Sequence, residues 1–228
     1  MIKTILLDLD DTIFDFKACE RQALSAALDS YSLPYSNSDL TDYSHINDSM
    51  WKLLEKGEIT REKLKTERFR VFLSRYDAPP TPEVFADRYM QKLANTSALE
   101  PGARAVLEHL SRSYSIYAVT NGYEFTQKGR IASAKIGNYF KRVFISQKIG
   151  AVKPQKAFFD YCVSQIPAFS LQETVLIGDS LSSDISGGNA YGLFTIRYNP
   201  NGESEDPAII PNREIKSLDE LPALLKTL

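Results

Sequence analysis

The sequence predicts an α/β fold: a doubly wound parallel sheet with an all-helical insertion. Five short runs rich in apolar and β-branched residues have the length and composition of buried parallel strands, at 4–7, 115–120, 142–146, 174–178 and 194–198. Helix-like segments separate the last four runs, whereas residues 17–97 show helical periodicity only and separate the first run from the second. Strands that alternate with helices imply right-handed crossovers, which cover both faces of one sheet with helices.

Four helix-like segments precede or follow the strand-like runs, at 101–110, 125–136, 154–165 and 183–191. Pro154 follows Lys153 and is expected at the first helical position, where a proline costs no hydrogen bond. At the C-terminus, Ser217 and Glu220 form a capping-box pattern, which predicts a last helix.

The insertion is predicted to contain four helices. Apolar residues recur there at the i, i+3, i+4, i+7 spacing of a buried helical face, as in Leu24, Ala27, Leu28 and Tyr31 and in Phe69, Phe72, Leu73 and Tyr76. Thr81 and Pro82 supply an N-cap and a first-turn proline for the last of these helices. We therefore expect a core domain formed by residues 1–16 and 98–228, with residues 17–97 as a helical cap inserted after the first strand.

The composition limits the classes of function. The chain has 228 residues, of which 43% are hydrophobic and 25% charged, and its formal net charge is −2. This balance gives no electrostatic basis for binding a nucleic acid polymer or an anionic membrane. Because Asp8 interrupts the N-terminal apolar run and no stretch is long enough to span a bilayer, we expect a cytoplasmic protein.

Cysteine and histidine are too scarce for several kinds of site. Cys19 and Cys162 fit neither a disulfide framework nor a CxxC site, so we expect two buried thiols. With His45 and His109 as the only histidines, a histidine-rich metal site is nearly excluded. A GxxxxGK[ST] loop is also absent from the sequence, which argues against a P-loop nucleotide hydrolase.

Two carboxylates directly follow the first strand. Asp8 and Asp10 are two residues apart, so an extended backbone points both side chains the same way, with Cα atoms roughly 6.6 Å apart. At a separation of about 5 Å and an effective dielectric of about 20, they repel by about 3 kcal/mol. Either one carboxyl stays protonated or a cation lies between them; the plain alternative is a solvated acidic loop. An ionised aspartate can act as a nucleophile, and a protonated neighbour as a general acid.

Polar clusters follow three further strands. Thr120 ends the second and Asn121 follows it, Lys153 lies just beyond the third, and Asp179 and Asp184 lie beyond the fourth. Taken singly, these could be a turn, a surface charge and helix caps. Together they fall at the carboxyl ends of parallel strands, which is where open α/β sheets bind their ligands.

These clusters resemble the four motifs of the haloacid dehalogenase superfamily in order, spacing and the position of a helical cap: Asp8-Leu9-Asp10-Asp11-Thr12, Thr120-Asn121-Gly122, Lys153-Pro154 and Asp179 with Asp184. More narrowly, MIKTILLDLDDTIFDF, WKLLEKGEITREKLKTERF and LIGDSLSSDISGGNAYG resemble segments of the bacterial pyrimidine-nucleotide phosphatases that remove noncanonical nucleotides.

The resemblance implies a phosphomonoesterase that acts through an aspartyl-phosphate. Asp8 matches the nucleophile, and Asp10 matches the general acid/base, a position that true dehalogenases do not use. Thr120 and Lys153 match the groups that hold the phosphate, with Asn121 beside them. Backbone N–H groups of the same loops would complete a cradle for the phosphate.

The implied cofactor is Mg²⁺, a hard cation that prefers oxygen ligands. Its ligands by resemblance are Asp8, the backbone carbonyl of Asp10, Asp179, and Asp184 directly or through water. The implied substrates are pyrimidine nucleoside 5′-monophosphates such as UMP, dUMP, dTMP and noncanonical analogues. We expect a small-molecule phosphomonoester as the partner and a monomer or homodimer as the assembly.

Two alternative functions use similar residues. A sugar-phosphate or acylneuraminate phosphatase of the same superfamily carries the same core motifs, because the cap chooses the leaving group. Cap aromatics such as Tyr43 and Trp51, with Phe14 and Phe16, could stack on a base or belong to the hydrophobic core. A non-enzymatic receiver-type module also uses aspartates, Mg²⁺, a threonine and a lysine, but its fold has no place for a helical insertion, and Ser146 ends the third strand where it needs an aspartate.

Overall fold

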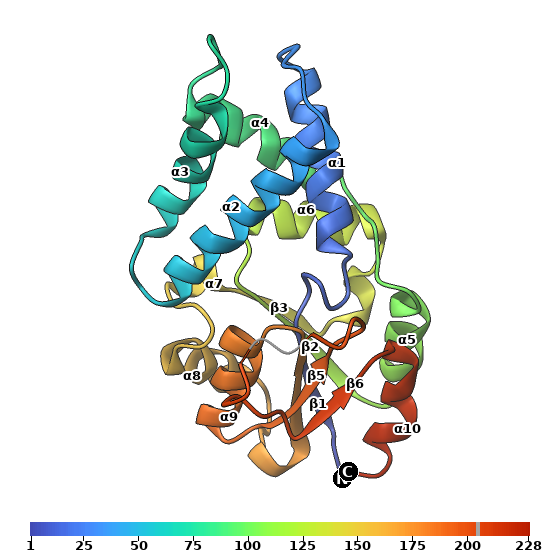
Figure 1. The fold of residues 1–228 in the computed structure, drawn as a ribbon. Helices are drawn as coiled ribbons and strands as arrows, with labels where there is room; N and C mark the ends of the chain where they lie inside the picture. Colours follow the sequence, from blue (N-terminus) through green and yellow to red (C-terminus); the bar gives the residue numbers. More distant parts are fainter. Residues whose placement is uncertain (204–205) are drawn as a thin grey trace. The chain divides into compact units, whose positions relative to one another are not determined.

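A computed structural model describes residues 1–203 and 206–228. The chain divides into two compact units, each of which is described by itself (Figure 1). The core unit contains Met1–Asp15, Leu99–Glu124 and Ala134–Leu228. The helical unit contains Phe16–Ala98 and Phe125–Ser133. Helix α6, Glu124–Ala134, thus belongs mainly to the helical unit, although it follows the second strand in the chain.

The core unit is built on one six-stranded parallel sheet with the strand order β3-β2-β1-β4-β5-β6. The strands are β1 Thr4–Leu7, β2 Ser115–Thr120, β3 Arg142–Ile145, β4 Thr174–Gly178, β5 Phe194–Tyr198 and β6 Arg213–Ile215. The predicted α/β class and all five predicted strands are confirmed. The edge strand β6 was missed because it has three residues, of which only Ile215 is buried.

The register of β1 places its end beside those of β2 and β4. Leu7 pairs with Ala118 of β2 and with Ile177 of β4. The N–H of Asp8 donates to the carbonyl of Ile177 at 2.9 Å, which extends the pairing by one residue. Residues that follow these three strands therefore meet at one edge of the sheet.

Helices cover both faces of the sheet (Figure 1). They are α5 Ala103–Leu110, α7 Ser146–Ile149, α8 Lys156–Ser164, α9 Ser186–Tyr191 and α10 Leu221–Leu225, with a π-helical turn at Leu181–Ile185 and 3-10 turns at Gly137–Tyr139, Leu171–Glu173 and Leu218–Glu220. On one face, Phe158 of α8 packs in a cluster with Leu6 and Leu176. Side chains alternate along a strand, so the neighbours of Leu6 point to the other face, and Ile5 and Leu7 are buried there as well.

The start of α8 differs from the prediction. The helix begins at Lys156, with Gln155 as its N-cap, and Pro154 lies in the preceding turn. The N–H of Gln155 donates to the carbonyl of Val152 at 2.8 Å, which closes that turn. A proline suits a turn as well as a first helical position, so its presence alone does not distinguish the two. The Lys153–Pro154 peptide bond is cis.

The helical unit contains α1 Phe16–Asp29, α2 Asn37–Glu55, α3 Arg61–Leu73 and α4 Pro82–Ala94, together with most of α6. The predicted N-cap at Thr81 is confirmed, because its side chain accepts from the N–H of Val84. Rings of α2, α3 and α4 pack against one another in the interior: Tyr43, Phe69, Phe72, Phe85 and Tyr89. Tyr43 is thus a core residue, whereas Trp51 is half-buried and lies under the guanidinium of Arg61.

A polar chain runs through the same interior. Asn47 Nδ2 donates to Glu20 Oε1 at 2.8 Å, and Arg68 Nη1 donates to Asn47 Oδ1 at 2.6 Å. All three residues are buried. The hydrogen bonds offset part of the cost of removing these polar groups from water.

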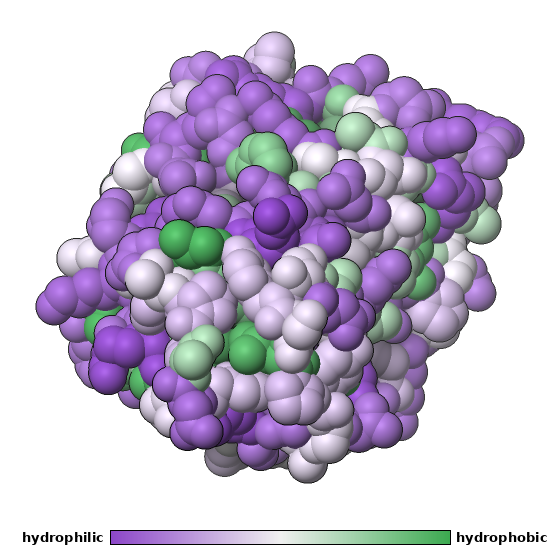
Figure 2. Space-filling model, turned by 90° about the horizontal axis from the view of Figure 1, so that it is seen from above, coloured by the Kyte–Doolittle hydropathy of each residue, from purple (hydrophilic) through white to green (hydrophobic). Residues whose placement is uncertain are grey.

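One face of the surface is mostly polar. Most side chains on the face shown in Figure 2 are hydrophilic, and the apolar ones among them are scattered. Within residues 1–203 and 206–228, no helix combines the length and the apolar character needed to cross a membrane.

Candidate active site

Asp8 stands at the carboxyl end of β1 and is 5% exposed. A tight loop follows it, in which the N–H groups of Ile13 and Phe14 both donate to the carbonyl of Leu9. Asp11 takes a left-handed conformation, with φ at 57°, and donates its N–H to Phe14. Aspartate tolerates this conformation better than most residues, so Asp11 serves the turn. The loop turns the chain away from the sheet, whereas Asp8 stays at the carboxyl end of β1.

Lys153 lies beside Asp8 although 145 residues separate them. Its ammonium group donates to Asp8 Oδ1 at 2.5 Å, to Asp184 Oδ1 at 2.7 Å and to the carbonyl of Val119 at 3.0 Å. These three acceptors satisfy all three N–H donors of a lysine ammonium. The side chain is buried, so the two carboxylates hold its charge in a site with little water.

Asn121 orients the backbone of Lys153. Its amide donates to the Lys153 carbonyl at 3.0 Å and accepts from the Lys153 N–H at 2.9 Å. This paired contact joins the loop after β2 to the loop before α8. The neighbouring Thr120 is 1% exposed, and its hydroxyl accepts from the N–H of Gly122 at 3.0 Å.

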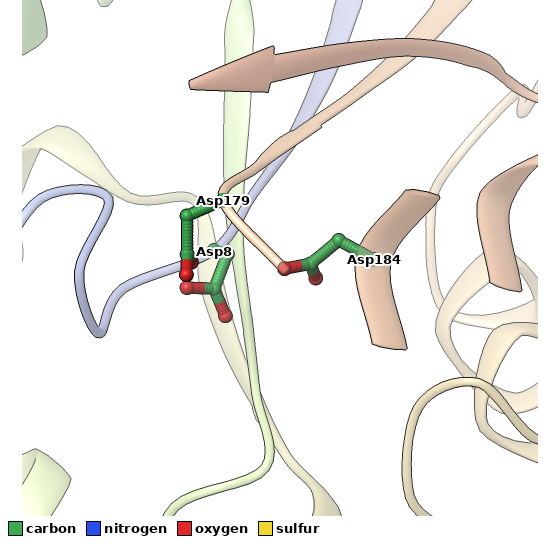
Figure 3. A group of neighbouring side chains, drawn as sticks. All are labelled: Asp8, Asp179 and Asp184. Atoms are coloured by element: carbon green, nitrogen blue, oxygen red, sulfur yellow. The ribbon is translucent and has the colours of Figure 1, made fainter. Parts of the chain in front are cut away.

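Three carboxylates converge at the same edge. Each of Asp8, Asp179 and Asp184 offers one oxygen, and these oxygens lie within 4.8 Å of one another. Figure 3 shows the carboxylates of Asp8 and Asp179 close together and that of Asp184 pointing toward them. Asp10 is half-buried, and its carboxylate is not part of this group.

Neighbouring residues hold two of these carboxylates in place. Thr12 is fully buried, and its hydroxyl donates to Asp179 Oδ1 at 3.1 Å. The N–H of Ser180 donates to Asp184 Oδ2 at 3.3 Å. The last residue of β4 is Gly178, and a Cβ added there would lie 2.4 Å from Asp184 Oδ2. Gly178 was not predicted as a site residue, although a glycine at a strand end before an acidic residue can indicate close packing.

Burial dominates the electrostatics of the group. It raises the pKa of Asp8 to about 8 despite the opposing attraction of Lys153, and the charges of Asp184 and Asp10 raise this pKa further. Burial also raises the pKa of Asp179 well above its usual value, as does the charge of Asp8. The protein by itself therefore disfavours full ionisation of this group. A divalent cation would restore it, and a set made only of oxygen donors fits a hard ion such as Mg²⁺.

The structure thus brings together most of the residues that the sequence analysis named. Asp8, Lys153, Asp179 and Asp184 form one cluster, in which Asp179 is half-buried and the other three are buried. Asn121 is joined to this cluster by its two hydrogen bonds with the backbone of Lys153. A buried carboxylate, a fixed ammonium and a group of oxygen donors suited to a cation can together support the transfer of a phosphoryl group.

Comparisons with known proteins point in the same direction. A family model described as haloacid dehalogenase-like hydrolase matches residues 2–192. Pyrimidine 5′-nucleotidase PynA of Streptococcus pneumoniae is 36% identical over 220 residues, which cover 96% of this chain and 93% of PynA. Pyrimidine 5′-nucleotidase YjjG of Escherichia coli is 29% identical over 221 residues, which cover 97% of this chain and 96% of YjjG. The crystal structure of the HAD-hydrolase YfnB from Bacillus subtilis, bound to magnesium, is 36% identical and superimposes with a TM-score of 0.93 over 98% of each chain.

Proposed function

The chain belongs to the haloacid dehalogenase-like hydrolases, and from this membership we propose that it is a Mg²⁺-dependent phosphomonoesterase that acts through an aspartyl-phosphate, with pyrimidine nucleoside 5′-monophosphates as its preferred substrates. The contact between Asp8 and Lys153, with Asp179 and Asp184 around it, is the observation that carries the proposal. It supplies a buried carboxylate and the positive charge that favours its ionised form.

In the first half of the reaction, a carboxylate oxygen of Asp8 attacks the phosphorus in line with the ester oxygen. The bond between phosphorus and the ester oxygen breaks, and Asp10 gives a proton to the leaving alkoxide. In the second half, Asp10 takes a proton from water, whose oxygen attacks the same phosphorus. The bond between phosphorus and the Asp8 oxygen breaks, inorganic phosphate is released, and both carboxyl groups return to their starting states.

The remaining residues bind and orient. The ammonium of Lys153 and the hydroxyl of Thr120 stabilise the negative charge that spreads over the phosphoryl oxygens in the transition state. Asp8, Asp179 and Asp184, with the backbone carbonyl of Asp10, would hold Mg²⁺. When bound, the ion would supply positive charge that favours ionised Asp8 and offsets the charge of the phosphate.

The proposed substrate class rests on PynA and YjjG, which cover nearly the whole chain and are both named pyrimidine 5′-nucleotidases. The magnesium in the YfnB structure supports the choice of ion. Aromatic stacking tolerates any base, so a preference for pyrimidines requires a pocket of limited size or polar groups that match the pyrimidine edge.

The first experiment replaces Asp8 by asparagine, which fills the same space but cannot attack phosphorus. We expect Asp8→Asn to lose more than about a hundredfold in kcat, equivalent to about 2.7 kcal/mol, while its melting temperature stays near that of the wild type. Asp29→Asn is the matched control, because it makes the same change at an exposed residue that ends α1 in the helical unit. An Asp8→Asn variant that kept more activity than this would refute the covalent mechanism.

The second experiment compares kcat/KM for UMP, dUMP and dTMP with values for purine nucleotides and sugar phosphates, with Mg²⁺ and with EDTA. We expect the pyrimidine nucleotides to lead and EDTA to abolish turnover. A sugar phosphate that exceeded dUMP by about tenfold, or about 1.4 kcal/mol, would refute the nucleotidase assignment and leave the phosphatase assignment standing.

A further inference from the structure

Arg197 lies next to the loop that carries Asp179 but belongs to a different strand. It pairs with Gly178 in the register of β4 and β5. Its side chain is only 8% exposed, which is unusual for an arginine. A buried guanidinium needs acceptors for its donors, so its contacts indicate what it does.

The guanidinium joins two loops at the carboxyl edge of the sheet. Arg197 Nε donates to the backbone carbonyl of Asp179 at 3.2 Å, and Nη1 donates to the backbone carbonyl of Glu203 at 2.8 Å. Glu214 of β6 is the charged partner, but its carboxylate is 3.5 Å away and 40% exposed. The short contact is therefore to a backbone carbonyl rather than to the carboxylate.

The loop that receives the second contact is itself held by Asn199. The side chain of Asn199 accepts from the Glu203 N–H at 2.9 Å and donates to the Glu203 carbonyl at 3.0 Å. Asn199 is 5% exposed, and its own N–H donates to the Ile215 carbonyl of β6 at 2.8 Å. The Glu203 carbonyl thus accepts from two side chains and gives Arg197 a fixed point of attachment.

We propose that Arg197 is a positioning residue for the metal site: it holds the peptide group of Asp179 so that the Asp179 carboxylate converges with Asp8 and Asp184. The inference rests on the Mg²⁺ site of the proposed function. The direction of the Asp179 side chain depends on its backbone, which Arg197 holds at the carbonyl, while Thr12 holds the carboxylate. The planar guanidinium of an arginine carries donors that point in different directions, so it can bind two carbonyls at once. The compact ammonium of a lysine is less suited to this.

The test compares Arg197→Met with the wild type and with the matched control Glu214→Gln, which removes the charged partner and leaves the contact with Asp179. Isothermal titration calorimetry with Mg²⁺ measures the Kd directly, and p-nitrophenyl phosphate gives kcat and KM. We expect Arg197→Met to raise the Kd for Mg²⁺ by about tenfold or more and to lower kcat with little change in KM, since the phosphate-holding residues stay in place. Glu214→Gln should keep the Kd of the wild type.

Each outcome decides between this inference and its alternatives. An Arg197→Met variant with a lower melting temperature but an unchanged Kd for Mg²⁺ would show that Arg197 only packs, and would overturn the inference alone. If Arg197→Met does not fold, Arg197→Lys replaces it, and a Kd within about twofold of the wild type would again overturn the inference. A wild-type protein that binds no Mg²⁺ would instead overturn the metal site of the proposed function, together with the inference that rests on it.

Discussion

Replacing Gly178 by alanine tests how closely the sheet edge must approach Asp184. The added Cβ would lie 2.4 Å from both Asp184 Cγ and Asp184 Oδ2, whereas ordinary contacts begin near 3.4 Å. Asp184 would therefore have to move by about 1 Å. It is 1% exposed and bonded to Lys153 and to the N–H of Ser180, so it cannot move without breaking these contacts.

The size of the effect follows from these contacts. Losing a hydrogen bond to a charged group costs about 1.5–3 kcal/mol. Forcing extra volume into a packed site costs about 1–3 kcal/mol. We therefore expect Gly178→Ala to lower the free energy of unfolding by about 3 kcal/mol. Because a displacement of about 1 Å in a catalytic site can cost about a hundredfold in rate, kcat should fall by a similar factor.

Urea unfolding and steady-state kinetics measure the two effects separately. Gly57→Ala in the helical unit is the control: φ is +74° there and no atom lies within 4 Å of the added Cβ. Alanine in this left-handed conformation should cost about 1–2 kcal/mol of stability and leave kcat unchanged. A double-mutant cycle with Asp184→Gly identifies the clash, because glycine removes all three Asp184 atoms that the added Cβ would meet, Cγ and Oδ2 at 2.4 Å and Cβ at 2.8 Å.

Two results would refute this reasoning. A Gly178→Ala protein with the kcat and Mg²⁺ dependence of the wild type would show that the position of Asp184 does not limit the reaction. A stability loss as large in the Asp184→Gly background as in the wild type would show that the clash is with something other than the Asp184 side chain.

Two further predictions concern ions and protons. Because Asp8, Asp179 and Asp184 crowd together, Mg²⁺ should stabilise the folded protein by about 2.7 kcal/mol at a hundredfold excess over its Kd. Calorimetry measures this, and the same melting temperature in Mg²⁺ and in EDTA would contradict the prediction. In the helical unit, burial raises the pKa of Glu20 above its value in the unfolded chain. The contribution of Glu20 to the free energy of unfolding is therefore fully present below the pKa of the unfolded state, and it is lost as the pH rises through the pKa of the folded state. Glu20→Gln keeps an acceptor for Asn47, so it should become more stable relative to the wild type as the pH is raised from about 5 to about 8. Urea unfolding measures this, and a difference in the free energy of unfolding that stayed constant over this pH range would contradict the prediction.

Local patterns in the sequence determined the architecture of the core unit and the edge at which its polar residues meet. The run 4–7 and the four later runs have the composition of buried strands, and their alternation with helices implies a parallel sheet. In such a sheet the carboxyl ends lie together, so residues that directly follow the strands, such as Asp8, Asn121 and Asp179, are placed at one edge by the pattern alone. The strand β6 and the start of α8 were missed because a three-residue edge strand and a proline in a turn leave weak or ambiguous local signals.

Only the tertiary structure decided which side chains touch at that edge. The ammonium of Lys153 lies between Asp8 and Asp184, Asn121 holds the backbone of Lys153, and Arg197 holds that of Asp179. These contacts join residues 18 to 145 positions apart, and each depends on side-chain rotamers and on the register between strands. Sequence periodicity specifies the face or the edge on which a residue lies, but it carries no information about the rotamer or the distant partner that completes a hydrogen bond.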